Sequence, residues 1–161
     1  FRVQVVEPES QAGTLMALKY RTTYDGIEAL RREAKIMMKI DEEEHVPHTV
    51  SMICYGHLKV PRIIWGFVPV LPKKSIVGKG LLITLAPGVR VGELVLSEAE
   101  KGVVREQLRS FAEAMYSKRL VHADLTVENV LWNRATSQLT VIDFGNSIDM
   151  TAANDTVTQR A

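Results

Sequence analysis

Asp124 and Asn129 are side chains whose types and spacing suit phosphoryl chemistry. They stand close together in the segment His122-Ala-Asp-Leu-Thr-Val-Glu-Asn129, between an expected helix and an expected strand. A carboxylate can orient a hydroxyl nucleophile and accept its proton, and an amide oxygen can bind Mg²⁺. The same residues are also typical of a turn in which both side chains only bond the local backbone. Taken alone, the pair favours the turn.

Asp143 favours the chemical interpretation. It follows the apolar run 139–142 and precedes Phe144 and Gly145. A carboxylate at the end of a buried strand is costly unless it is paired or bound to a metal. Gly145 would let the backbone turn sharply there. Because Mg²⁺ is usually held by one or two carboxylates plus substrate phosphates, Asp143 and Asn129 supply a suitable set, and a hairpin between them would bring them together.

Lys19 and Glu33 form a second candidate pair. Lys19 lies in a half-apolar expected strand, where a lysine ordinarily faces solvent. Glu33 lies on the flank of an apolar helix face, between Leu30 and Met37, where a carboxylate needs a partner. Lys19 is a candidate partner because this helix directly follows its strand. Surface ion pairs are common and contribute little to stability, so the pair by itself is weak evidence of function.

The first half of the chain is expected to contain an antiparallel hairpin and a helix. Residues 1–7 and 14–20 read as strands, joined by turn residues 8–13. Asp25 is the expected N-cap of the helix, with Glu28 completing a capping box. The apolar face of that helix is formed by Ile27, Leu30, Ala34 and Met37.

Further elements follow with clear boundaries. We expect residues 41–44 to end the helix as a solvated acidic turn, and residues 50–58 to form a strand. Residues 59–80 read as a strand plus an extended loop, either an ordinary insertion or a docking surface. Residues 81–85 form an apolar strand that stops at Ala86-Pro87-Gly88.

A second helix has its own capping box, Ser97 with Glu100, and should end near Lys118. Residues 129–132 and 139–144 then predict a hairpin. This order of elements predicts an α+β fold with a ligand cleft between its halves. The apolar face of the second helix is formed by Val104, Leu108, Phe111 and Met115.

Composition restricts the class of protein. A chain of 161 residues with 46% apolar residues fits one domain with a real core, and a net charge of +1 argues against nucleic-acid binding. The most apolar run, 63–71, is broken by Pro69 and is shorter than the roughly 20 residues of a membrane span. The single cysteine, Cys54, has apolar neighbours that predict a buried thiol, and it fits a reducing, intracellular and cytoplasmic location.

Together these positions resemble the eukaryotic protein-kinase-like superfamily in order and approximate spacing. The loop from His122 to Asn129, followed by Asp-Phe-Gly at 143–145, is the specific part of the pattern. The resemblance covers nearly the whole chain and rests on Met16-Ala-Leu-Lys19, Glu33, His122-x-Asp124-x-x-x-x-Asn129 and Asp143-Phe-Gly145.

The resemblance implies a two-lobed fold. Residues 1–85 would be an N-lobe with an antiparallel sheet and one helix, lacking the first strand and the Gly-rich phosphate loop. Residues 86–161 would be the hinge and a partial, mainly helical C-lobe that carries the catalytic loop. We therefore expect one incomplete kinase domain, a piece of a longer protein.

The resemblance also implies ATP and Mg²⁺ as cofactors. Lys19 would hold the α- and β-phosphates, steadied by Glu33, and Asp124 would be the catalytic base. Asn129 and Asp143 would bind Mg²⁺. The remaining implied roles are an adenine sandwich of Ala17 and Leu131, a gatekeeper at Ile83, hinge backbone groups at Thr84, Leu85 and Ala86, and an internal spine of Met37, His122 and Phe144.

Two departures from the pattern of this superfamily bear on which hydroxyl accepts the phosphate. Ala123 stands where many protein kinases carry Arg, and Thr126 stands where Ser/Thr kinases usually carry Lys. The same loop is similar to that of aminoglycoside-phosphotransferase-type kinases. We expect phosphoryl transfer to a protein Ser/Thr hydroxyl. A small-molecule phosphotransferase, or a non-catalytic pseudokinase that acts as an interaction module, is the alternative.

Overall fold

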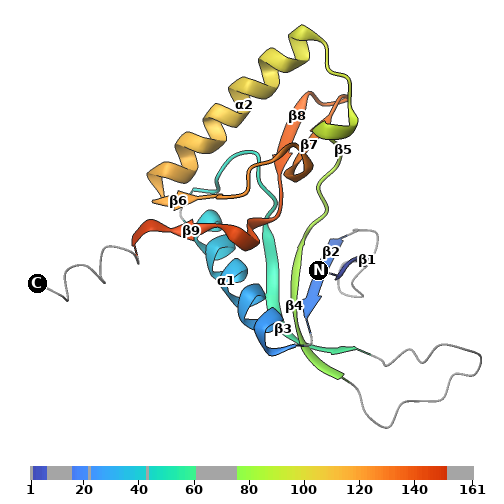
Figure 1. Ribbon diagram of the computed structural model, residues 1–161, viewed down its shortest axis with the longest axis vertical. Helices are drawn as coiled ribbons and strands as arrows, with labels where there is room; N and C mark the ends of the chain where they lie inside the picture. Colours follow the sequence, from blue (N-terminus) through green and yellow to red (C-terminus); the bar gives the residue numbers. More distant parts are fainter. Residues whose placement is uncertain (1, 7–15, 22, 43, 61–75, 152–161) are drawn as a thin grey trace, which may run out of the picture.

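A four-stranded antiparallel sheet forms the first part of the protein (Figure 1). The computed structural model describes residues 2–6, 16–21, 23–42, 44–60 and 76–151. The strands are β1 (Arg2–Val6), β2 (Met16–Arg21), β3 (Met52–Val60) and β4 (Ile76–Thr84), in the order β1-β2-β4-β3. The predicted hairpin is confirmed, with Val3 opposite Lys19. Most of the expected loop, residues 61–75, lies outside the described residues.

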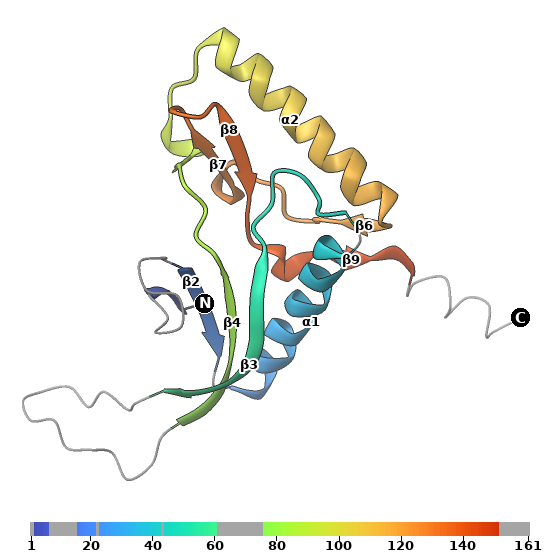
Figure 2. The same cartoon turned by 180° about the vertical axis from the view of Figure 1, so that it is seen from behind.

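Helix α1 (Tyr24–Asp41) covers one face of this sheet (Figure 2). Leu30, Ala34 and Met37 are buried as their spacing predicted, and so is Glu33. The predicted N-cap was wrong: the cap is Thr23, whose carbonyl accepts the Ile27 N–H at 2.9 Å. Asp25 lies in the first helical turn instead, where the helix dipole still favours its negative charge.

Strand β3 differs from expectation at Cys54, whose thiol is exposed rather than buried. The pairing of β3 with β4 shifts register between Met52 and Cys54. Because side chains alternate between the faces of a strand, such an irregularity changes which residues face the core. The apolar neighbours of Cys54 in the sequence therefore did not determine its burial.

The second part of the protein is built on helix α2 (Glu98–Ser117) and a hairpin. Ser97 and Glu100 form the predicted capping box, and Lys118 is the C-cap. The hairpin strands are β7 (Val130–Asn133) and β8 (Gln138–Val141), so residues 142–144 leave the strand earlier than predicted. Three short strands were not predicted: β5 (Val89–Arg90), which pairs with β7, and β6 (Leu120–Val121), which pairs with β9 (Ile148–Asp149).

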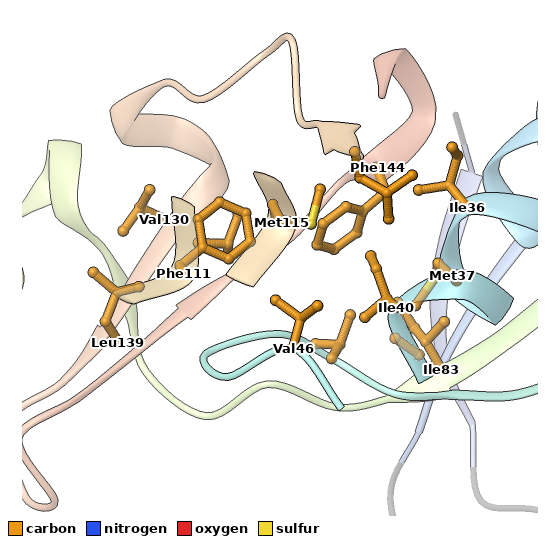
Figure 3. Close-up of a cluster of buried hydrophobic side chains, with 14 of the residues drawn as sticks. Ile36, Met37, Ile40, Val46, Ile83, Phe111, Met115, Val130, Leu139 and Phe144 are labelled. Atoms are coloured by element: carbon orange, nitrogen blue, oxygen red, sulfur yellow. The ribbon is translucent and has the colours of Figure 1, made fainter. Parts of the chain in front are cut away.

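The hydrophobic core is continuous from α1 to α2 (Figure 3). Met37 and Ile40 from α1, Phe111 and Met115 from α2, and Phe144 are all buried in it. Burial of such side chains contributes about 1.5–3 kcal/mol each, and a shared core holds the two parts in a fixed relation. The expected α+β arrangement of strands and helices is confirmed. Neither α1 nor α2, the α-helices of the described ranges, combines the length and apolar composition that crossing a membrane requires.

Candidate active site

A cavity of about 390 Å³ lies between the four-stranded sheet and the β7–β8 hairpin. Its volume is in the range of small-ligand sites, which span about 300–1,000 Å³. The residues that line it come from β2 and β4, from the segments before β3 and after β4, from β5, from β7 and from the loops that flank the hairpin. The lining residues are Ala17, Lys19, Val50, Ile83, Thr84, Leu85, Ala86, Arg90, Glu128, Asn129, Leu131, Ile142 and Asp143.

Several of the residues that line this cavity are apolar. Ala17 and Ile83 lie opposite each other in paired strands, and both are buried. Leu131 comes from the hairpin of the second part, so apolar groups from two different sheets line the same space. Thr84, the last residue of β4, lines the same cavity together with Leu85 and Ala86, and its N–H already donates to the Ser51 carbonyl at 3.0 Å. This arrangement suits a flat aromatic ring with a polar edge.

Lys19 is the central charged group. Its ammonium donates to Glu33 Oε1 at 2.5 Å and to Asp143 Oδ1 at 2.8 Å. The Lys19 and Glu33 side chains are only 7% and 2% exposed, so this is a buried ion pair rather than a surface one. Burial raises the pKa of Glu33, although the nearby ammonium of Lys19 opposes that shift. Glu33 Oε2 has no hydrogen-bond partner among the described residues.

Asp143 reaches Lys19 through an unusual backbone conformation. It adopts the left-handed region, with φ 66° and ψ 73°, which few residues other than glycine enter. Burial alone would raise the pKa of Asp143, but the Lys19 ammonium and the Gly145 N–H outweigh burial and hold that pKa below its usual value. The sharp turn predicted at Gly145 is thus made by Asp143 itself. Gly145 instead lies in the short 3₁₀ helix η4 (Phe144–Asn146).

His122 contacts the two residues that flank Asp143 in the chain. Its ring packs edge-on against Phe144, with centroids 4.9 Å apart, and its Nε2 lies 3.1 Å from the carbonyl oxygen of Ile142. Burial lowers the pKa of His122, although the Ile142 carbonyl opposes that shift. The next residue, Ala123, is left-handed at φ 59°. Met37 belongs to the same buried cluster as Phe144, so the three spine residues named from the sequence share one core region.

Asp124 and Asn129 are joined by their side chains. Asn129 Nδ2 donates to the Asp124 carbonyl oxygen at 2.9 Å and to Asp124 Oδ2 at 3.3 Å. The first of these bonds is the local turn that the simpler interpretation predicted. Both bonds use the amide nitrogen, and no described residue donates a hydrogen bond to the amide oxygen of Asn129. Asn129 lines the cavity with Asp143, and their loops are linked by the Ile142 N–H bond to the Asn129 carbonyl at 2.9 Å.

Residues 28–159 match the family model of the ABC1 atypical kinase-like domain. The chain belongs to this family. The match confirms the protein-kinase-like superfamily, and it places the chain among kinase-like phosphotransferases or pseudokinases. Comparison with curated proteins gives no match.

The ABC1 domain brings most of its sequence-predicted site residues to one place. Two of them do not line the cavity: Glu33 is buried behind Lys19, and Asp124 lies beside Asn129. Four lining residues were missed by the sequence analysis, namely Val50, Arg90, Glu128 and Ile142. Glu128 and Ile142 could have been found as the chain neighbours of Asn129 and Asp143. Val50 and Arg90 had no comparable signal.

The oxygen groups of the ABC1 domain suit a cation held jointly with a ligand. No cluster of three or more His, Cys, Asp or Glu side chains that could hold a metal occurs in the described ranges. Mg²⁺ is commonly bound through one or two protein oxygens together with substrate phosphates and water. The carboxylate of Asp143 and the amide oxygen of Asn129, on the wall of one cavity, fit that mode of binding.

Proposed function

We propose that this domain binds ATP with Mg²⁺ in the cavity and transfers the terminal phosphoryl group to a hydroxyl. One observation carries the proposal: a cation, two oxygen donors and a neighbouring carboxylate converge from three separate segments, namely β2, the loop 122–129 and the residues after β8. Lys19, Asn129 and Asp143 share the cavity wall, and Asp124 bonds directly to Asn129. Catalysis of this kind is mainly positioning and electrostatic stabilisation, so such convergence is what it requires.

The apolar inner cavity would receive the adenine. Ala17 and Leu131 would contact its two faces, with Ile83 at the back. Thr84, Leu85 and Ala86 would offer backbone hydrogen-bonding groups at the rim. In this proposal residues 1–85 act as the N-lobe and residues 86–161 as the hinge and partial C-lobe, so the nucleotide would lie between them. The cavity supports this division because its lining residues come from both ranges.

The polar end of the cavity would hold the phosphates. Lys19 would bind phosphate oxygens while Glu33 keeps its ammonium in place. Asp143 and Asn129 would bind Mg²⁺, which neutralises phosphate charge when it is present. Asp124 would accept the proton of the acceptor hydroxyl. Its Oδ1 receives no hydrogen bond from any described residue, so one carboxylate oxygen is available for that proton.

The acceptor we propose is a protein serine or threonine. The catalytic loop, residues 122–129, supports a second candidate for the phosphate acceptor. Ala123 and Thr126 leave this loop without the cationic side chains that many protein kinases carry there. A loop without those cations also suits a small hydroxyl compound. Phosphate transfer to generic Ser/Thr protein substrates, compared with transfer to small alcohols and aminoglycosides, separates the two.

The test is ATP turnover by the purified protein with and without Mg²⁺. Asp124→Ala should abolish transfer while the far-UV circular dichroism spectrum and the melting temperature are retained. Saturating ATP with Mg²⁺ should raise the melting temperature of both proteins, because a ligand that binds only the folded state stabilises it. A shift without turnover would make the protein a nucleotide-binding pseudokinase, and no shift at all would favour an interaction module. Unchanged turnover in Asp124→Ala would contradict the catalytic assignment.

A further inference from the structure

Asn146 makes a contact that is explained neither by the Asp-Phe-Gly motif nor by the lining of the cavity. Its Nδ2 donates a 3.1 Å hydrogen bond to Asp124 Oδ2. Asn146 is the last residue of η4, directly after the Asp-Phe-Gly segment, so this bond spans 22 positions of the chain. Its side chain is exposed and does not line the cavity. The bond therefore belongs to the surroundings of Asp124 rather than to the core.

The bond makes the two oxygens of Asp124 different from each other. Asn129 and Asn146 both donate to Oδ2, at 3.3 Å and 3.1 Å. Oδ1 accepts no hydrogen bond within the described part of the chain. Two donors on one oxygen fix the rotation of the carboxylate and direct the other oxygen away from both amides. A fixed orientation of this kind is what a base needs to accept a proton from a positioned hydroxyl.

The catalytic loop alone cannot supply this second donor. The only described side chain of that loop that donates to the Asp124 carboxylate is Asn129. Thr126, which stands two residues after Asp124, uses its backbone N–H on the Asp124 carbonyl at 3.0 Å, and its side chain is exposed. The second donor comes instead from the loop that begins with Asp143. The two loops thus meet at Asp124 as well as at the Ile142–Asn129 backbone bond.

We propose that Asn146 is a positioning residue that orients the Asp124 carboxylate for phosphoryl transfer. The proposal rests on the proposed function, since it assigns Asn146 a role through Asp124. Asn146 touches neither nucleotide nor metal site in this scheme. Loss of its amide should therefore lower the rate of transfer and leave nucleotide binding unchanged.

A purely structural role would have a different signature, and the chain offers a matched control. Ser147, the next residue, donates a 3.2 Å bond from its Oγ to the His122 carbonyl oxygen. That bond also ties the two loops together, but it does not reach the Asp124 carboxylate. Ser147→Ala therefore removes an inter-loop bond of similar length without altering the donors of Asp124.

The experiment compares steady-state phosphoryl transfer by wild type, Asn146→Leu, Asn146→Asp, Asn146→Gln and Ser147→Ala. Leu and Asp are close to Asn in size but lack the donor, and Gln retains an amide. We expect kcat to fall roughly tenfold or more in the Leu and Asp variants, as general-base catalysis contributes about 10²–10⁴-fold. The KM for ATP and the melting-temperature shift with ATP and Mg²⁺ should stay at wild-type values. Gln should recover part of kcat, and Ser147→Ala should stay within about twofold of wild type.

Each other outcome contradicts a specific claim. An active wild type with unchanged kcat in Asn146→Leu would overturn the positioning role and leave the proposed function standing. An equal loss in Ser147→Ala would show that inter-loop bonding in general, and not the orientation of Asp124, sets the rate. A raised KM for ATP with unchanged kcat would assign Asn146 to nucleotide binding instead. An inactive wild type would overturn the proposed function and the positioning role together.

Discussion

Lys19 in β2 donates a 2.8 Å hydrogen bond to Asp143, which lies 124 positions later in the chain and just after β8. The same ammonium bonds Glu33 of α1. A strand, a helix and the loop after a hairpin are thereby joined at one nitrogen atom. If either carboxylate moved by a few ångströms, the cation would lose a partner in a buried site. The geometry of the candidate phosphate site is therefore coupled to the packing of α1 against the sheet.

Lys19→Met should destabilise the fold. It would leave the Glu33 carboxylate buried without its cation, and breaking a buried ion pair in this way costs about 3–5 kcal/mol. Burial already raises the pKa of Glu33, and loss of Lys19 would raise it further. Glu33 in the folded variant would then keep its proton at pH values above 4.5, where Glu33 of the unfolded chain releases it. The free energy of unfolding of the variant should therefore decrease as pH rises. Urea unfolding at pH 5 and pH 8 should show the larger loss at pH 8.

The control for this prediction is the double variant Lys19→Met with Glu33→Gln, which removes the buried charge. It should be more stable than Lys19→Met alone at pH 8. An equal loss of stability at both pH values, with no recovery in the double variant, would show that Glu33 is not held as an uncompensated charge.

Leu131→Trp should block nucleotide binding without unfolding the protein. Leu131 lines the cavity from β7, and a larger ring there would occupy the space proposed for adenine. We expect the Kd for an ATP analogue, measured by isothermal titration, to rise at least about tenfold, which corresponds to 1.4 kcal/mol. Val95→Trp is the matched control, because Val95 is 91% exposed and outside the cavity. Equal affinities in both variants would argue that the nucleotide binds elsewhere.

Phe144→Ala should cost about 3–5 kcal/mol of unfolding free energy, the usual range for a buried Phe reduced to Ala. Phe144 is 1% exposed, lies in the core shared by both parts, and packs against the His122 ring. Denaturant unfolding measures the loss directly. Tyr116→Ala removes a ring that is 73% exposed and should change stability by about 0.5 kcal/mol or less. A similar small change in Phe144→Ala would contradict the shared core.

Glu100 should make the protein sensitive to acid. Its carboxylate accepts bonds from Arg134 Nε at 2.7 Å and from the Ser97 backbone N–H at 2.8 Å. The Arg134 bond, followed by the bond from Ser97, lowers the pKa of Glu100 to about 2. A lowered pKa stabilises the fold above the unfolded value of 4.5, and this stabilisation is lost as pH falls toward 2.

Melting temperatures between pH 2 and pH 7 test this assignment. Glu100→Gln should melt below wild type at pH 7, and the difference should shrink to nothing near pH 2. A difference that is independent of pH would mean that Glu100 acts through its hydrogen bonds as a cap and not through its charge.

Several features could be predicted from the sequence because local physics decides them. The capping box of Ser97 and Glu100, the apolar face of α1 and the β7–β8 hairpin depend on neighbours a few residues apart. Two local predictions failed. Thr23 rather than Asp25 caps α1, so the helix begins slightly earlier than its side-chain pattern indicated. Cys54 is exposed, and the register of β3 against β4 is irregular beside it, which depends on a strand distant in the sequence.

The sequence by itself determined which chemical groups this protein carries and in what order, and that order sufficed to indicate the superfamily. The tertiary structure alone decided how those groups meet. It buried Lys19 between Glu33 and Asp143, set Asp143 in a left-handed conformation, and brought Asn146 to Asp124. The physical reason is that these contacts join residues 14, 22 and 124 positions apart in the chain. Their distances follow from how the sheet, α1 and the hairpin pack, and local propensity carries no information about them.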